Sequence, residues 1–265
     1  MRSPFFCGPR LDPPVAVRDN DRLMNPAAHL PVLEVTGLRK SFGAAPVLNE
    51  VSFTLSAGGC LVLLGTNGAG KTTLLKIVAT LLRPSAGRVW VSGLDAQRET
   101  DAVRRRVGLL AHGSYLYEDL SALENLRFWA TLAGLDASPE RLRATLGRVE
   151  LEAVADERAR NFSAGMKRRL ALARILLGAP ALLLLDEPFD GLDQRGKKWL
   201  EEFILAFKGA RGAVLLATHS FSRGWGVADR VAILASGRIA LDRPREGLDL
   251  SELHRLYTLY TEEAE

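Results

Sequence analysis

A glycine-rich segment at residues 65–73 carries the clearest chemical signal in the sequence. It fits the pattern G-x-x-x-x-G-K-[ST], follows an apolar run at residues 61–64 and precedes residues that are apolar at helical spacing. A strand, a glycine-rich loop and a helix in this order bind phosphate, because backbone N–H groups turn inward and the helix adds its positive end. A tight turn beside a solvated lysine is the alternative. We expect phosphate contacts from Gly65, Thr66, Asn67, Gly68, Ala69, Gly70, Lys71, Thr72 and Thr73.

Two adjacent acids supply a second signal. Asp186 and Glu187 follow the apolar run at residues 181–185. Asp186 at the end of its strand, together with the hydroxyl of Thr72, is expected to hold Mg²⁺. Glu187 can orient or deprotonate an attacking water molecule. The alternative is that both acids only cap the next turn.

Composition sets the broad class. The 265 residues are 47% hydrophobic and 25% charged, which indicates a globular chain with attached subdomains. The net charge of +4 suits nucleotides or an anionic surface, but it does not indicate DNA binding, and we expect no nucleic-acid partner. Cys7 and Cys60 alone form neither a disulfide framework nor a zinc cluster, which fits a reducing cytoplasm. No apolar run reaches the ~18–20 residues of a membrane span.

The hydrophobic pattern predicts a sheet that positions the chemical groups. Apolar runs alternate with helical segments, which indicates a parallel sheet covered on both faces. These runs lie at residues 61–64, 107–111, 181–185 and 213–218. In open parallel sheets, ligands bind beyond the carboxyl ends of the strands. The phosphate loop, the acid pair and His219 all follow such ends.

Two smaller layers are expected beside this sheet, so the fold class is α/β. Strands with alternating polarity indicate an antiparallel subdomain, at residues 32–35, 51–55 and 88–91. Residues 115–162 read as a helical subdomain, in which Ser121 and Glu124 form a capping box before a helix over residues 122–132.

The ends of the chain differ from this core. Residues 1–30 contain scattered prolines and charges without periodicity, and we expect a flexible tail, with Met24 as a possible translation start. Residues 31–245 form one nucleotide-binding domain. Residues 246–265 are expected to form a charged C-terminal helix.

The order of these motifs resembles that of the ATP-binding subunit of ABC transporters, over residues 32–242. The phosphate loop matches the family's Walker A motif, and residues 182–187 match its Walker B motif with the catalytic glutamate. Residues 162–166, Phe-Ser-Ala-Gly-Met, resemble a degenerate LSGGQ signature. Residues 191–193 resemble the D-loop, which includes Asp193 among the nucleotide-binding candidates.

The resemblance implies a RecA-like P-loop NTPase fold, with ATP and Mg²⁺ bound and ATP hydrolysed. His219 resembles the switch histidine, which would hold the γ-phosphate and the attacking water with Glu187. Phe42 resembles the A-loop aromatic residue and would stack on adenine; a core or edge aromatic residue is the alternative. Two copies would pair head to tail, so Ser163 and Gly165 would contact the γ-phosphate bound by the partner. For both residues an ordinary helix N-cap is the alternative.

The resemblance also implies a place of work and partners. Such a subunit lies at the cytoplasmic face of the cell membrane and serves separate transmembrane permease subunits. Tyr115, Leu116 and Tyr117 would form the surface on which a permease docks, or would pack under the helical insertion. Cargo and transport direction are not encoded in this chain.

Two regions depart from the family pattern. His112 stands where the family has glutamine; it would contact a phosphate-side water or Mg²⁺ through water, or have no special role. Ala164 and Met166 replace glycine and glutamine of the signature, which leaves the hydrolysis rate open. His112, Gly113 and residues 120–128 resemble the ATPase of the haem exporter of cytochrome c maturation. An ATPase of a drug, lipid or polysaccharide exporter is the alternative.

Two alternatives belong to other classes of protein. A soluble ABC ATPase of DNA repair would carry a long coiled coil, for which the interval between residues 73 and 182 is too short, and a translation ATPase would carry two tandem units. A P-loop kinase needs neither a signature nor a switch histidine, and no acceptor-binding lid is recognisable.

Overall fold

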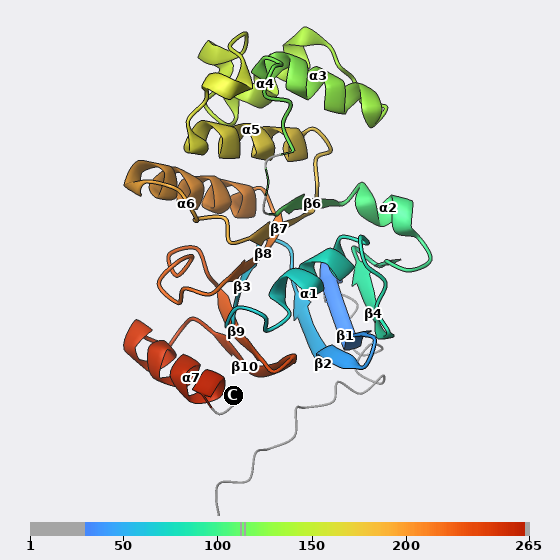
Figure 1. The fold of residues 1–265 in the computed structure, drawn as a ribbon, viewed down its shortest axis with the longest axis vertical. Coiled ribbons are helices and arrows are strands. Elements are labelled where there is room, and N and C mark those ends of the chain that lie inside the picture. Colours follow the sequence, from blue (N-terminus) through green and yellow to red (C-terminus); the bar gives the residue numbers. More distant parts are fainter. Residues whose placement is uncertain (1–29, 112, 114, 263–265) are drawn as a thin grey trace, which may run out of the picture.

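The computed structural model describes residues 30–111, 113 and 115–262 (Figure 1). The expectations for the N-terminal tail, apart from Leu30, and for His112 therefore lie outside the described residues. No helix in the described part of the chain combines the length and apolar character that crossing a membrane requires.

A six-stranded sheet, in the order β10-β9-β3-β8-β7-β6, runs through the centre of the molecule (Figure 1). All neighbouring pairs are parallel except β9 and β10, which form an antiparallel hairpin. The strands are β3 (Cys60–Leu64), β6 (Val107–Leu110), β7 (Leu182–Asp186), β8 (Ala213–Thr218), β9 (Arg230–Ala235) and β10 (Arg238–Pro244). The apolar runs thus form the predicted parallel sheet, and the fold class is confirmed.

A four-stranded antiparallel sheet, in the order β2-β1-β4-β5, forms the second layer. Its strands are β1 (Leu33–Phe42), β2 (Ala45–Leu55), β4 (Ala86–Val91) and β5 (Leu94–Asp95). β1 and β2 are longer than predicted. Their register shifts between Val35 and Leu38, where Gly37 has φ 56°. A bulge breaks the alternation of side chains, which is why the sequence pattern ended the first strand too early.

The helices lie around the two sheets and at both ends of the molecule. Figure 1 shows α3, α4 and α5 together at one end, with α1 beside the antiparallel sheet. The helices are α1 (Lys71–Val78), α2 (Thr100–Arg104), α3 (Ala122–Leu132), α4 (Pro139–Gly147), α5 (Ala164–Leu176), α6 (Gln194–Gly209) and α7 (Leu250–Glu262), with short 3-10 helices η2 (Glu152–Val154) and η3 (Ala159–Asn161). α3 begins at the predicted capping box, since Ser121 Oγ accepts from Glu124 N and Glu124 Oε2 accepts from Ser121 N.

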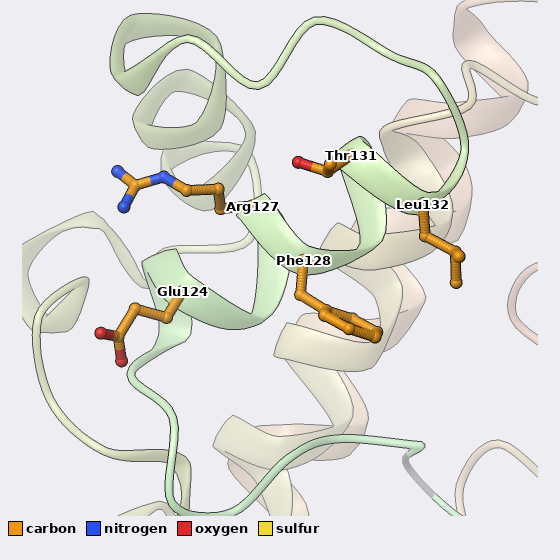
Figure 2. Close-up of a pocket in the computed structure, with 5 residues that line it drawn as sticks. All are labelled: Glu124, Arg127, Phe128, Thr131 and Leu132. Carbon is orange, nitrogen blue, oxygen red and sulfur yellow. The ribbon is translucent and has the colours of Figure 1, made fainter.

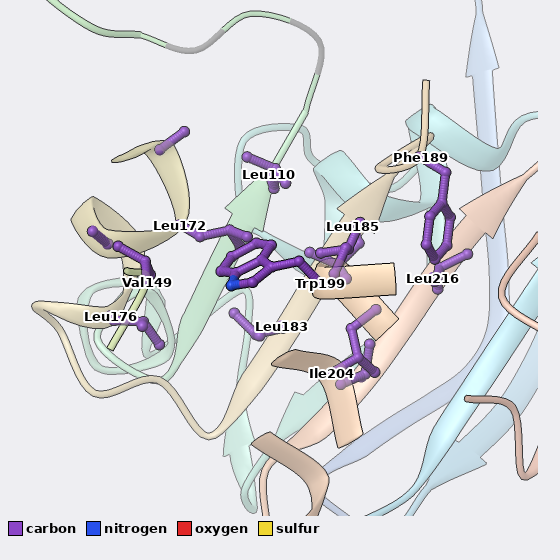
Figure 3. Packing of buried hydrophobic residues seen from close by; sticks show 14 of the residues in the cluster. Leu110, Val149, Leu172, Leu176, Leu183, Leu185, Phe189, Trp199, Ile204 and Leu216 are labelled. Carbon is purple, nitrogen blue, oxygen red and sulfur yellow. The ribbon is translucent and has the colours of Figure 1, made fainter. Parts of the chain in front are cut away.

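Each face of the central sheet packs into its own core. Successive side chains of a strand point to opposite faces. Leu183 and Leu185 therefore join a core with Leu172 of α5 and Trp199 of α6 (Figure 3), whereas Leu182 and Leu184 join a core shared with α1 and the antiparallel sheet. All four β7 leucines are fully buried. Burial on both faces fixes the position of the polar groups that follow the strand.

Candidate functional site

The loop at residues 65–70 connects β3 to α1 and depends on its glycines. Gly68 has φ 85°, and Gly70, the N-cap of α1, has φ 103°. Residues that carry a Cβ rarely adopt these positive φ angles. A Cβ at Gly65 would lie 2.6 Å from the backbone oxygen of Leu234, so the loop also packs too closely there for a side chain. Gly70 offers no side-chain cap, which leaves the first N–H groups of α1 available to an anion.

Lys71 brings a buried positive charge to this loop. Its Nζ donates to the backbone oxygens of Gly65 at 2.7 Å and Thr66 at 3.0 Å, and it lies 3.9 Å from Glu187 Oε1. Burial lowers the pKa of Lys71, whereas Glu187 and Asp186 favour its charged form. With 6% of its surface exposed, Lys71 is not the solvated lysine of the alternative interpretation.

Asp186 ties the loop helix to the central sheet. Asp186 is the last residue of β7, and its Oδ2 accepts from Oγ1 of Thr72 in the first turn of α1 at 2.7 Å. Carboxylate and hydroxyl oxygens are ligands that Mg²⁺ accepts. The donor set therefore fits the ion that the sequence predicted at this point.

Glu187 is the centre of the hydrogen-bond network. Its N–H donates to the backbone oxygen of Ala217 at 2.9 Å, which continues the pairing of β7 with β8, and its φ of 46° turns the chain at this residue. Its Oε2 accepts from Thr218 Oγ1 at 2.8 Å, and its Oε1 lies 2.9 Å from His219 Nδ1. Because the carboxylates of Asp186 and Glu187 bond to side chains from other elements, the idea that they only cap the next turn is wrong.

This arrangement can orient a small polar molecule. An ionised carboxylate only accepts hydrogen bonds, so His219 Nδ1 carries the proton in its bond to Glu187. The imidazole is partly open, with 43% of the side chain exposed, whereas the Glu187 carboxylate is almost fully buried. A fixed, buried carboxylate beside an accessible histidine is suited to holding a water molecule for attack on a phosphate.

The signature and D-loop residues lie at the starts of two other helices. Ser163 Oγ accepts from Met166 N at 3.2 Å and caps α5, while Asp193 Oδ1 accepts from Gly196 N at 2.7 Å and caps α6. In the described part of the chain, no hydrogen bond connects Ser163 with residues 65–73. The structure therefore joins the Walker motifs and His219 but leaves the signature apart from them.

Phe42 lies on the surface at the end of β1. Half of it is exposed, and Lys40 Nζ lies 4.8 Å from the ring centroid. Phe42 pairs with Ala45 across the hairpin, and the backbone oxygen of Val47 in the same hairpin would be only 2.9 Å from a Cβ at Gly70. A core role for the ring is therefore wrong, and the ring belongs to the hairpin that touches the phosphate loop.

Sequence reasoning missed three residues around Glu187. Thr218 bonds its carboxylate, while Asp190 and Arg223 form an ion pair between the segments that follow Glu187 and His219. The position of Thr218 directly before His219 was a signal that could have been used. Nothing in the sequence indicates that Asp190 and Arg223 meet, because 32 residues separate them.

Comparison with known proteins gives consistent matches. The profile of the family described as ABC transporter matches residues 48–190. A daunorubicin resistance ATP-binding protein from Streptomyces coeruleorubidus is 39% identical over 209 residues, covering 78% of this chain and 66% of that protein. A lantibiotic transport ATP-binding protein from Streptococcus pyogenes is 32% identical over 230 residues, covering 86% of this chain and 98% of its own.

A solved structure agrees with these relatives. The ATP binding subunit of an ABC transporter superposes with a TM-score of 0.75 at 30% identity, covering 86% of this chain and 99% of that one. The family match includes both the phosphate loop and the acid pair. Neither relative is named for haem, so the resemblance to a haem exporter gains no support from them.

Proposed function

Since the chain belongs to the ABC transporter family and is an ATP-hydrolysing subunit, we propose that it drives export through separate membrane subunits. The observation that carries the proposed site is the Glu187 carboxylate, which is bonded to Thr218 and His219 and lies 3.9 Å from Lys71 Nζ. These groups come from three elements that meet at the carboxyl edge of the central sheet.

Each residue then has a chemical role. Lys71 and the backbone N–H groups at the start of α1 bind the ATP phosphates. Glu187 orients the attacking water and accepts its proton, and His219 holds the same water from the open side. Thr72 and Asp186 would hold Mg²⁺, which neutralises phosphate charge when it is bound. Phe42, half exposed on the neighbouring hairpin, stacks on the adenine ring.

Two copies of the chain complete the site. Ser163 and Gly165 lie at the start of α5, apart from the phosphate loop of their own chain. A helix N-terminus attracts anions, so this end suits the γ-phosphate held by a partner in a head-to-tail dimer. Asp193, which caps α6, lies on the segment between Glu187 and that helix and takes part in the same contact.

Membrane partners dock on the helical end, at the cytoplasmic face. Tyr115 and Tyr117 are 63% and 47% exposed, whereas Leu116 packs against the core, so only the tyrosines serve the expected docking surface. A pocket of about 400 Å³ lies along one face of α3, and Figure 2 shows Phe128 and Leu132 among the side chains that line it. We call Tyr115, Tyr117, Phe128 and Leu132 the α3 surface.

We infer the cargo class from the named relatives rather than from the short resemblance to a haem exporter at residues 112–128. Those relatives are named for daunorubicin resistance and lantibiotic transport. An exporter of drug-like or peptide-derived compounds is therefore preferred to the haem exporter. His112, on which the haem interpretation depended, lies outside the described residues.

The Glu187→Gln variant tests the catalytic assignment. The amide keeps the size of the side chain but cannot take a proton from water, so ATP should still bind while hydrolysis falls by roughly 100-fold or more. Release of inorganic phosphate and equilibrium binding of a fluorescent ATP analogue measure the two steps. Glu202→Gln on α6 serves as the control, because this exposed glutamate pairs with the exposed Lys198 and lies outside the proposed site. Unchanged hydrolysis in Glu187→Gln would contradict the assignment.

A further inference from the structure

The segments that follow Glu187 and His219 are joined by one ion pair. Arg223 Nη1 contacts Asp190 Oδ1. The backbone N–H of Asp190 donates to the backbone oxygen of Glu187 at 3.2 Å, and the backbone N–H of Arg223 donates to the backbone oxygen of Ser220 at 3.1 Å. Each charged residue thus closes a short turn that begins at or beside one of the two proposed catalytic residues. The ion pair fixes these turns against each other.

Asp190 is also close enough to interfere with the site. One oxygen of Asp190, one oxygen of Glu187 and one ring nitrogen of His219 all lie within 4.8 Å of one another. Two carboxylates at this separation repel each other, and either can accept the single proton that His219 offers at a given nitrogen. His219 Nδ1 lies 2.9 Å from Glu187 Oε1, while Arg223 occupies the competing carboxylate.

A second arginine fixes the backbone of the same turn. Arg168 of α5 donates from Nη2 to the backbone oxygen of Asp190 at 3.3 Å. The helix that begins at the signature therefore contacts the turn between Glu187 and Asp193 directly. This bond holds the Asp190 backbone independently of the ion pair, so we expect loss of Arg223 to free the Asp190 side chain without removing its turn.

We propose that Arg223 is a positioning residue for ATP hydrolysis: it neutralises Asp190 and thereby keeps the imidazole of His219 on Glu187. This inference rests on the proposed roles of Glu187 and His219. The ion pair itself adds little to folding stability, because about a third of each side chain is exposed, 32% for Arg223 and 37% for Asp190. Its function is to direct the hydrogen bond of His219.

The Arg223→Ala variant should lose turnover while keeping ATP. An uncompensated Asp190 draws His219 away from Glu187, and misplacement of a catalytic group by about 1 Å costs on the order of 10- to 100-fold in rate. We expect kcat of the purified chain to fall by this factor with KM for ATP unchanged. Arg223→Lys should retain most of the activity, because the ammonium can still pair with Asp190. Arg255→Ala, an exposed arginine of α7, is the matched control.

A double variant distinguishes this role from simple loss of a structural contact. Adding Asp190→Ala to Arg223→Ala removes the competing carboxylate, so kcat should recover most of the loss. If Arg223 only braced the loop, the double variant would be no better than the single one, and that result would overturn the proposal, as would a single variant with unchanged kcat. Glu187→Gln, measured in parallel, reports separately on the proposed function: if it hydrolyses ATP normally, the site assignment itself is wrong.

Discussion

Lys71 donates to two carbonyl oxygens of its own loop, and these are weaker partners than phosphate oxygens. Neutral acceptors form weaker hydrogen bonds than ionised ones. Burial lowers the pKa of Lys71, and the neighbouring Glu187 and Asp186 carboxylates oppose this shift. The lysine is therefore held in the loop with its charge available, which is the arrangement a phosphate site requires.

Replacing Lys71 tests this at the level of one side chain. Charge-assisted hydrogen bonds contribute about 1.5–3 kcal/mol each, so Lys71→Ala should weaken ATP binding by roughly 100-fold. Isothermal titration with ATP measures the affinity, and circular dichroism checks that the fold is retained. Lys76→Ala, a charge change later in the same helix, should bind ATP normally. Equal affinities for both variants would refute the phosphate role of Lys71.

The residues of the proposed site were predictable because each is next to a strand or loop that the sequence itself defines. Gly70 requires a positive φ and Asp186 ends an apolar run, so both can be located along the chain. The partners of Glu187 were harder to predict. Arg223 meets Asp190 only because β7 and β8 are neighbours in the sheet, and sequence spacing contains no record of that contact.

At the scale of elements, α3 is held in place so that one of its faces stays open. Its capping box fixes the start, and buried Asn125 accepts from Tyr117 N at 2.8 Å and donates to the Tyr117 oxygen at 2.9 Å. Tyr117 packs edge-on against Phe128 with ring centroids 4.7 Å apart. The helix was predictable from its capping signal, whereas this loop contact was not.

The open face of α3 predicts where membrane partners attach. Burying a phenylalanine contributes about 1.5–3 kcal/mol, so Phe128→Asp should weaken attachment by roughly 10- to 100-fold. The amount of the chain that remains with detergent-extracted membrane proteins from native cells measures this. Leu259→Asp, the same kind of change at an exposed position of α7, is the control. Equal recovery of both variants would contradict docking through the α3 surface.

The proteins recovered in that experiment also test the cargo class. Membrane subunits that bind drug-like or peptide-derived compounds support the proposed exporter. Haem absorbance or haem-handling proteins in the extract would instead restore the interpretation based on residues 112–128.

At the scale of the whole molecule, the central sheet separates two cores that serve different parts of the site. One core supports α1 and the phosphate loop, and the other supports α5, whose first residues carry the signature. The motif order along the sequence predicted both parts and the α/β fold. In the proposed head-to-tail dimer the halves of different copies pair, which would account for one chain containing both halves without joining them.

A substitution at Gly165 can disrupt the proposed contact of the α5 N-terminus with the partner's ATP without changing the phosphate loop. A Cβ at Gly165 would have its nearest neighbours at 3.9 Å, so the first atom of an aspartate side chain meets no close contact there. Its negative charge at the start of α5 would repel the γ-phosphate of a partner. The phosphate loop of the same chain, and therefore its own ATP binding, should remain intact.

The most direct test is the molar mass in solution of Glu187→Gln with and without saturating ATP and Mg²⁺, measured by light scattering. ATP that is bound but not hydrolysed should double the mass, and adding Gly165→Asp should abolish the doubling while the chain still binds ATP. A Glu187→Gln chain that binds ATP and stays monomeric at high protein concentration, or a Gly165→Asp double variant that still dimerises, would contradict the composite ATP site.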